Sequence, residues 1–485
     1  MKALILSTAT GGGHNTAAHA VMEALTERGV ECRFEDCVAF GGQKLSATVS
    51  NVYVKFVQAA PDAFGRLYRF AKAISTPRIK SPVYLFNAAY ARKMEQLLTD
   101  YAPDLIVCTH MFGGQSVTYL RRHDLWNGLF AMVMTDYTIH PFIEDIECDV
   151  MFTCKAAMPS ARRLALPKSA YEFTGIPVSL SCRPCTDKRA AKEAVGLDPE
   201  RPEVVLVGGS MGAGNLPEMI ARILPVLGEN GHLTVVCGSN VDALRRATEA
   251  YGSDPRVSLR AQVTPLTPLI AAADVLVTKS GGLTSTEAMT IGTAIVVAHP
   301  IAGCETENAR FMEDNKLALW AHTDDELTAK VADLLRHPEK RAEMIAKQHE
   351  KIDPDCARKI ADILIRRTNE MMGRNAPDAG ETGTADEKIR RDFDRVRPGC
   401  AVRAARACNQ PAAPAALLHS DDSGADDCGV QPDNGVLHSQ LSGQLRLPAR
   451  DESARRADCG EFGSREHLRG QRRIHAGHSG QADVH

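Results

Sequence analysis

The segment 273–312 constrains the fold of this chain more than any other part of the sequence. It opens with an apolar run, Ala273–Thr278, whose length and composition are typical of a buried parallel strand. Ser280-Gly281-Gly282 then predicts a tight turn, and Leu283–Ile291 predicts a short helix. Small residues at this turn leave the first amides of the helix bare, so an anion such as a diphosphate can bind there.

Polar residues in the rest of this segment could bind the hydroxyl groups of a nucleotide sugar. Glu287 lies one turn into the predicted helix, where its carboxylate can accept hydrogen bonds from two vicinal hydroxyls. A second strand, Ala294–Ala298, leads into a polar loop that contains Pro300–Glu305 and Asn308 and precedes another helix. An anion site, a diol acceptor and a polar loop in one βαβ unit indicate a nucleotide-sugar site. The alternative for Glu287 is a cap or salt bridge within its own helix.

Together these motifs resemble the donor-site signature of the GT-B glycosyltransferases. The resemblance is to the family of monogalactosyldiacylglycerol synthases and processive diacylglycerol glucosyltransferases, which is related to the lipid II-forming N-acetylglucosaminyltransferase. It extends over about residues 1–370 and implies an α/β fold of two facing Rossmann-like domains with the active site in the cleft between them. It also implies that Glu287 holds the ribose of a UDP-sugar. Cys304 stands where many members have Gln, which leaves the hexose open.

A second glycine-rich turn, Gly208–Gly214, follows the apolar strand Glu203–Val207. Its glycines let backbone amides approach a phosphate, and the loop resembles the one in the lipid II-forming enzyme. The resemblance therefore implies a donor site made by residues at the diphosphate, the ribose, the uracil and the sugar: Gly209, Ser210, Met211, Gly212, Val263, Ser280, Gly281, Gly282, Leu283, Thr284, Glu287, Gly303, Cys304, Glu305 and Asn308.

The N-terminus repeats the pattern of strand, glycine turn and helix. A strand over Lys2–Thr8 is followed by Thr10–His14 and by a helix to about Arg28. His14 lies at the start of this helix, where the helix dipole disfavours the imidazolium and keeps the ring neutral, as a general base requires. In the family that the chain resembles, this loop faces the acceptor. The alternative is a histidine at a helix N-terminus that has no role in catalysis.

Further polar residues follow two other predicted strands, Asp104–Thr109 and Leu129–Thr135. Because the carboxyl ends of parallel strands meet at one crevice, these residues are expected to join the N-terminal loop in an acceptor site. The predicted acceptor residues are Gly12, Gly13, His14, His110, Asp136 and His140, with Asp136 or His140 as the second choice of base. No pair of carboxylates at metal-ligand spacing accompanies them, so neither a metal nor a cofactor is expected.

The segment Lys44–Lys93 differs from the rest of the chain in charge and in aromatic content. It contains nine Lys or Arg residues against one acid, Asp62, and it contains eight aromatic residues. Such a segment predicts contact with an anionic membrane surface, since each basic residue near that surface contributes about 1 kcal/mol. The alternative is a solvated basic face over an ordinary aromatic core. The residues expected at the membrane are Phe64, Arg66, Tyr68, Arg69, Phe70 and Lys72.

Composition excludes several other classes of protein. A formal net charge of −3 argues against a nucleic-acid-binding protein. No run of about 18 apolar residues is present, and Met1-Lys2 leads directly into a strand, so the chain is expected to be cytoplasmic and peripheral on the inner face of the cell membrane. The 14 cysteines lack framework spacing and are expected to be reduced packing residues. Cys182-Arg-Pro-Cys185 lacks the second ligand pair of a zinc site, which favours a chance pair in a linker.

Three regions are predicted along the chain. Residues 1–177 form an acceptor- and membrane-binding domain, and residues 178–372 form a UDP-sugar-binding domain. Residues 373–485 contain too little apolar material to build a core and are expected to be disordered.

The predicted activity is inverting transfer of glucose or galactose from a UDP-sugar to diacylglycerol or glycosyl-diacylglycerol. Two alternatives remain open. One is an N-acetylglucosaminyltransferase that acts on a polyprenyl-linked cell-wall intermediate, which the Gly208–Ala213 loop favours. The other is a UDP-sugar sensor that docks on a membrane or on a division protein without essential turnover.

Overall fold

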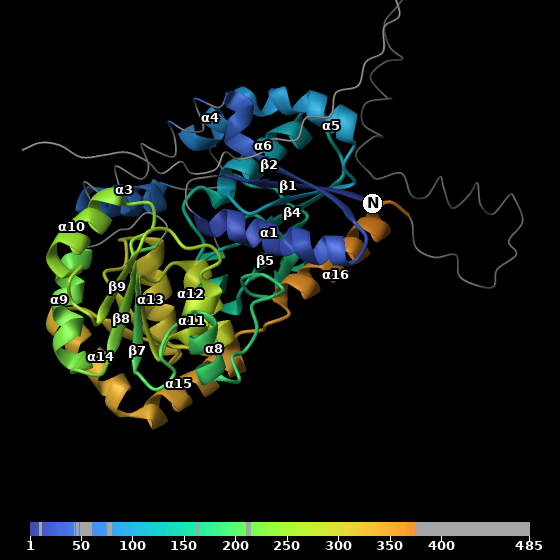
Figure 1. Cartoon of the computed structure of the whole chain (residues 1–485). Helices are drawn as coiled ribbons and strands as arrows, with labels where there is room; N and C mark the ends of the chain where they lie inside the picture. The colour runs from blue at the N-terminus through green and yellow to red at the C-terminus, as the bar shows by residue number, and fades with distance from the viewer. Residues whose placement is uncertain are drawn as a thin grey trace, which may run out of the picture. The chain divides into compact units, whose positions relative to one another are not determined.

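The computed structural model describes residues 1–8, 12–42, 44, 48, 61–74, 80–161, 164–209 and 215–373. These residues form two Rossmann-like units, each built on a six-stranded parallel sheet with helices on both faces (Figure 1). The predicted α/β architecture is therefore confirmed. The predicted disordered tail lies outside the described residues, except for Gly373.

The first unit has the strand order β2-β1-β3-β4-β5-β6. Its strands are β1 (Lys2–Ser7), β2 (Glu31–Asp36), β3 (Leu105–Cys108), β4 (Leu129–Val133), β5 (Val150–Thr153) and β6 (Tyr171–Phe173). Its helices are α1 (Gly12–Glu27), α3 (Pro61–Ile74), α4 (Pro82–Ala91), α5 (Glu95–Tyr101), α6 (Met111–Arg122) and α7 (Met158–Ala161). Alternate residues of β1 face opposite cores: Leu4 and Leu6 pack with α5 and α6, and Ala3 and Ile5 pack with α1.

The second unit has the strand order β12-β11-β10-β7-β8-β9. Its strands are β7 (Glu203–Val207), β8 (His232–Val236), β9 (Val257–Arg260), β10 (Val275–Thr278), β11 (Ala294–Ala298) and β12 (Leu319–Ala321). Its helices are α8 (Lys188–Ala194), α9 (Leu216–Leu227), α10 (Val241–Tyr251), α11 (Thr267–Ala272), α12 (Gly282–Ile291), α13 (Cys304–Asp314), α14 (Asp324–Arg336) and α15 (Pro338–Lys351). The central strands are buried on both faces, as their continuous Val, Leu and Ile runs predict.

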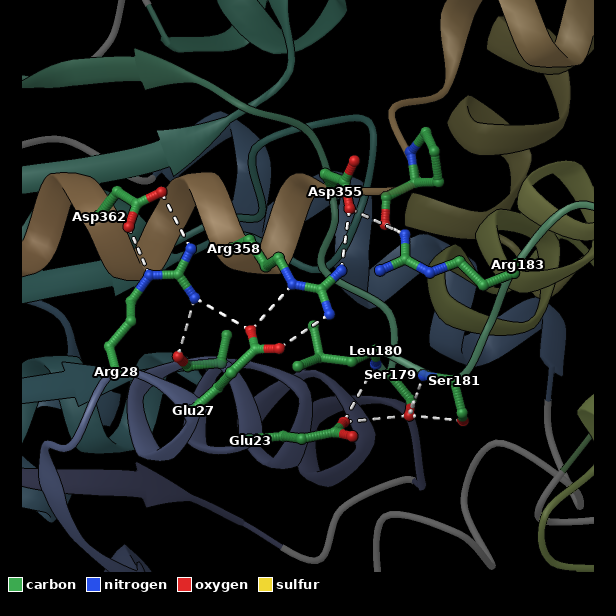
Figure 2. A network of polar contacts seen from close by, with 12 residues as sticks. Glu23, Glu27, Arg28, Ser179, Leu180, Ser181, Arg183, Asp355, Arg358 and Asp362 are labelled. Atoms are coloured by element: carbon green, nitrogen blue, oxygen red, sulfur yellow. Dashed lines mark hydrogen bonds and ion pairs between the residues drawn. The ribbon is translucent and has the colours of Figure 1, made fainter.

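The last described helix, α16 (Cys356–Met371), returns to the first unit, as the resemblance implies. Its residues Ile360 and Leu364 are fully buried in the same core as Ala3 and Ile5 of β1. Figure 2 shows the polar contacts that border this packing. Arg358 binds the Glu27 carboxylate of α1 at 2.8 and 3.0 Å. Because these ion pairs are open to solvent, they add little to stability, and the apolar contact dominates.

The linker between the units is held by the same network. Glu23 of α1 accepts hydrogen bonds from Ser179 Oγ at 3.1 Å and from the Leu180 amide at 3.0 Å (Figure 2). Arg183 donates to the Asp355 carboxylate at 2.9 Å, just before α16 begins. The two crossings between the units, one at the linker and one at α16, thus lie beside α1. The predicted boundary between residues 177 and 178 stays a prediction.

Most predicted elements agree with the structure to within one to three residues, and one helix begins earlier than expected. Helix α6 begins at Met111, where the His110 ring accepts a hydrogen bond from the Phe112 amide and caps the helix. Helix α13 begins at Cys304, directly after Gly303, which has a φ of 118°. Cys304, Glu305 and Asn308 therefore lie on a helix and not in the predicted loop. Within the described residues, no helix is long and apolar enough to cross a bilayer.

Candidate active site

The first turns of α1 and α12 meet between the two units. A Cβ on Gly282 would lie 1.9 Å from the carbonyl oxygen of Thr135, so only glycine permits this approach of the two backbones. Gly13 approaches the side chain of Leu283 less closely, since its Cβ would lie 3.6 Å from Leu283 Cβ. The two predicted glycine turns are therefore brought together, and each helix directs its positive end towards the junction.

Helix α12 has the bare N-terminus that a diphosphate site requires. Its N-cap is Gly281, no side chain caps it, and no acidic residue lies in its first turn. Gly209 lies close by with a φ of +74°, and a Cβ there would meet the Lys279 side chain at 2.4 Å. Ser210, Met211 and Gly212 lie outside the described residues. The two donor loops of the second unit thus adjoin each other at Lys279.

Lys279 is a site residue that the sequence reasoning missed. Its ammonium is paired with Glu305 of α13, and the other carboxylate oxygen of Glu305 accepts a hydrogen bond from the Ile301 amide at 2.9 Å. The sequence does contain a signal for it, because a lysine stands directly before the Ser280-Gly281-Gly282 turn. Glu305 fixes the loop that precedes α13, and its expected contact with the sugar stays a prediction.

Glu287 lies one turn into α12 and is half-buried. Burial raises the pKa of its carboxyl to about 7. Within the described residues, no hydrogen bond or ion pair to this carboxylate is seen. The alternative role, a helix cap or a salt bridge within α12, is therefore not supported by any contact there. A half-buried carboxylate without a partner is costly and is suited to a ligand that brings hydroxyl donors. Leu283 and Thr284 line the same turn, and Val263 lies half-buried in the β9–α11 connection.

Asn308 joins the two units. Its side-chain nitrogen donates to Asp136 Oδ1 at 2.6 Å and to the Ser280 carbonyl at 3.0 Å, and its oxygen accepts from the Tyr137 amide at 2.9 Å. The side chain is fully buried. Its amide is thereby engaged with protein groups, and the expected contact with a sugar stays a prediction.

The His14 ring is held in one tautomer at the start of α1. Its Nδ1 lies 2.9 Å from the Thr109 carbonyl oxygen and 3.1 Å from Thr135 Oγ1. Because a carbonyl can only accept, Nδ1 carries the proton, and Nε2 is left as the acceptor nitrogen. Burial lowers the pKa of His14, which Asp136 opposes only in part, so the ring is neutral at pH 7. A neutral imidazole in a fixed tautomer can serve as a general base.

Asp136 and His140 form a pair at the end of β4. His140 Nε2 lies 2.8 Å from Asp136 Oδ2. Burial alone would lower the pKa of His140, but the Asp136 carboxylate outweighs it and raises that pKa. Burial would likewise raise the pKa of Asp136, and the neighbouring His140 lowers it. With Asn308 on its other oxygen, Asp136 has both carboxylate oxygens in hydrogen bonds, which leaves His14 as the less engaged base.

His110 completes the predicted histidine group, but its described contacts are structural. Its ring lies edge-on to the His14 ring with centroids 4.6 Å apart, and its Nδ1 caps α6. Burial lowers the pKa of His110 well below its usual value, so it stays neutral.

With this geometry in place, the chain can be compared with known proteins. The family described as monogalactosyldiacylglycerol (MGDG) synthase matches residues 14–178, and the glycosyltransferase family 28 C-terminal domain matches residues 203–360. The chain belongs to this group of GT-B glycosyltransferases. The resemblance that the sequence motifs indicated is thereby confirmed.

Two relatives of this glycosyltransferase and one solved structure of another protein illustrate the similarity. Monogalactosyldiacylglycerol synthase 1 of Arabidopsis thaliana is 27% identical over 398 residues, which cover 76% of this chain and 72% of that protein. A processive diacylglycerol beta-glucosyltransferase of Staphylococcus saprophyticus is 26% identical over 279 residues, 57% of this chain and 71% of that protein. The crystal structure of CalG4, the calicheamicin glycosyltransferase, has a TM-score of 0.51 and 14% identity over 76% of this chain and 98% of its own. That last likeness shows a shared fold.

Helix α3 of the glycosyltransferase packs on the donor unit with one face. A Cβ on Gly65 would lie 2.7 Å from Ala302 Cβ, and the Tyr68 ring lies against Gly303. Lys72 forms an ion pair with Glu307 of α13. Tyr68 and Lys72, expected at the membrane, therefore face the second unit. No local pattern could have predicted this, since Glu307 lies 235 residues after Lys72.

The opposite face of α3 carries apolar side chains. Leu67, Phe70 and Ile74 are 52%, 61% and 48% exposed, which is unusual for large apolar residues on one helix. Arg66 and Arg69 are also exposed, but Arg69 lies one turn after Gly65 and so borders the donor-facing side. The side chain of Phe64 and residues 45–47, 49–60 and 75–79 of the basic segment lie outside the described residues. The described helix is thus amphipathic, with a donor-facing side and an outer side.

Proposed function

We propose that this glycosyltransferase transfers glucose or galactose from a UDP-hexose to diacylglycerol or glycosyl-diacylglycerol with inversion at the anomeric carbon. One observation carries the proposal: the bare N-terminus of α12, with the unpartnered carboxylate of Glu287 behind it, adjoins a neutral His14 from the other unit. The relatives named for diacylglycerol glycosylation support the acceptor class.

In the proposed donor complex, the α12 amides and the adjoining loop at Gly209 hold the diphosphate. The carboxylate of Glu287 accepts hydrogen bonds from the two ribose hydroxyls, which offsets the cost of its burial. The α13 N-terminus, with Gly303 and Cys304, lies at the hexose. Amides and helix dipole stabilise the charge that develops on the departing UDP.

The transfer step has one bond formed and one broken. The acceptor hydroxyl oxygen attacks the anomeric carbon from the face opposite UDP. The bond between that carbon and the UDP oxygen breaks, and its electron pair stays on the β-phosphate. The hydroxyl proton passes to Nε2 of His14, the proposed base, whose Nδ1–H is held by Thr109 and Thr135.

We also assign the outer face of α3 to peripheral docking on an anionic membrane at the inner face of the cell. Leu67, Phe70 and Ile74 supply apolar area, and Arg66 and Arg69 at the borders of this face supply charge. Docking by this face leaves the opposite side of α3 on the donor unit, beside Gly303. An acceptor hydroxyl delivered from the bilayer then enters beside the sugar.

The substrate assignment is tested with radiolabelled UDP-glucose and UDP-galactose, each offered with diacylglycerol vesicles. Lipid-soluble label from either donor is the expected result. Label that appears only with UDP-N-acetylglucosamine and a polyprenyl-linked acceptor would support the alternative transferase. UDP binding without transfer to any acceptor would support a sensor.

Membrane docking is tested by flotation of Arg66→Gln/Arg69→Gln with anionic vesicles. The variant should bind several-fold more weakly at low salt, because surface attraction is screened by salt and scales with charge. Arg245→Gln/Arg246→Gln on α10 removes two exposed arginines elsewhere and is the matched control. Lys72 is left unchanged, since its partner is Glu307. Equal flotation of both double variants and the parent would contradict the assignment.

A further inference from the structure

Three side chains of different chemistry converge between the two units. They are Asp136 at the end of β4, His140 in the following loop and Cys304 at the first position of α13. One ligand atom from each, a carboxylate oxygen, a ring nitrogen and the sulfur, lies within 4.8 Å of the other two. Asp136 is buried, and the other two side chains are half-buried.

The charges around these three side chains favour binding of a cation. Each of the two neighbouring lysines already has a carboxylate partner: Lys279 is paired with Glu305, and Lys72 is paired with Glu307. With Cys304 as thiolate, Asp136 as carboxylate and His140 neutral, the group carries two negative charges. A divalent ion would balance them.

The donor set selects the kind of ion. Thiolate and imidazole favour zinc-class ions, whereas magnesium and calcium prefer oxygen ligands alone. In a tetrahedral zinc site with bonds of about 2.0–2.3 Å, neighbouring ligand atoms lie about 3.3–3.8 Å apart. His140 Nε2 and Asp136 Oδ2 are 2.8 Å apart, and Cys304 Sγ lies within 4.8 Å of the ligand atoms of both residues. Side-chain rotations that move each atom by roughly 1 Å would bring all three to the distances of a tetrahedral site.

We propose that Asp136, His140 and Cys304 form a zinc-class metal site, with the fourth position left for water or another small donor. When Zn²⁺ binds, Cys304 loses its thiol proton and His140 the proton it shares with Asp136, and both go to solvent. Bonds from sulfur, nitrogen and oxygen to the metal replace them. Because the ion takes hold of both members of the Asp136–His140 pair beside His14, bound zinc inhibits transfer.

The test uses Co²⁺ as a spectroscopic probe on the full chain, kept reduced with a phosphine. Parent protein should show a thiolate-to-cobalt absorption band in the near ultraviolet, and Zn²⁺ should displace it. Cys304→Ser should lose the band and weaken Co²⁺ binding by about 100-fold or more, since even outer partners of a site contribute about 10–100-fold. His140→Gln should weaken binding similarly while retaining the thiol.

Cys185→Ser is the matched control, because Cys185 is, like Cys304, a half-buried free cysteine. It should keep both the band and the affinity, and circular dichroism and melting temperature should show that all variants are folded. If the band survives in Cys304→Ser, or is lost in Cys185→Ser, the proposed site is wrong. The cobalt signal needs no substrate, so its outcome is independent of the transfer reaction. The expected functional counterpart is that Zn²⁺ inhibits transfer by the parent protein over the same concentration range in which it displaces Co²⁺.

Discussion

The N-termini of α1 and α12 have the same local structure but different roles in the proposed reaction: α1 carries the base for the acceptor, and α12 binds the donor. Each follows a buried strand and a glycine turn, and each points its positive end into the junction of the units. At α1 the turn ends in His14, whose ring is fixed by Thr109 and Thr135. At α12 no side chain occupies the turn, and the first charged side chain of the helix is Glu287.

The difference shows that a glycine turn and a helix do not by themselves define a ligand. The bare turn at α12 suits an anion, because nothing competes for its amides. The turn at α1 has a ring at the same place, and the helix dipole and burial act on that ring to keep it neutral. The same strand, glycine turn and helix therefore form an anion site at α12 and position a base at α1, and the side chain that follows the glycines makes the difference.

The strongest test of this contrast is removal of the base. His14→Ala should reduce turnover by about 10²–10⁴-fold, the usual contribution of a general base, while UDP binding in the other unit is kept. Single-turnover rates and UDP titration measure the two effects. Asp136→Asn is the companion variant. If it abolishes turnover and His14→Ala barely changes it, Asp136 is the base.

The same substitution at the two glycine turns should have unequal effects. Gly282→Ala forces the Thr135 backbone away, and a shift of about 1 Å at the site lowers turnover by about 10²-fold. Gly13→Ala meets only the Leu283 side chain at 3.6 Å, so turnover should change by less than about 3-fold. Steady-state rates of both variants give the comparison. Equal losses would mean that the close approach at Gly282 is unimportant.

The carboxylate behind α12 is tested by its effect on donor binding. Glu287→Ala should weaken UDP binding by about 1.5–3 kcal/mol, the usual contribution of a charged hydrogen-bond partner. Titration calorimetry on the folded variant measures this. An affinity equal to that of the parent would contradict the ribose assignment and revive a purely structural role for Glu287.

The smallest expected effect is a pH-dependent gain in stability. The folded-state pKa of Glu287 is raised to about 7 from 4.5, so its protonated form stabilises the fold, and this contribution is lost as pH rises through 7. Glu287→Gln avoids that loss. Its melting temperature should match the parent at pH 4.5 and exceed it by about 2–5 °C at pH 8 without UDP. A constant difference across this range would contradict the raised pKa.

The sequence predicted those features that depend on neighbouring residues. Buried strands such as Val275–Thr278 follow from continuous apolar runs, and the glycine turns follow from small residues between a strand and a helix. The two-unit fold came from the resemblance, which the family matches confirm.

Features that depend on distant residues were not predictable. Tyr68 and Lys72 face the donor unit because they contact Gly303 and Glu307, which belong to that unit. The assignment of Asn308 to the sugar came from the resemblance, and its contacts with Asp136 and Tyr137 were not predictable because those partners are remote in sequence. The convergence of Cys304 on the Asp136–His140 pair has the same origin.

The return of α16 to the first sheet has a consequence for synthesis on the ribosome. The first unit ends its strands at Phe173, yet one helix of its core is not complete until Met371. At about 5–20 residues per second, the intervening roughly 200 residues take on the order of 10–40 s to translate. During that interval Ala3, Ile5 and their neighbours are without the apolar face of Ile360 and Leu364. The first domain to emerge is therefore the last to become complete, and a chain that stops before α16 leaves it open.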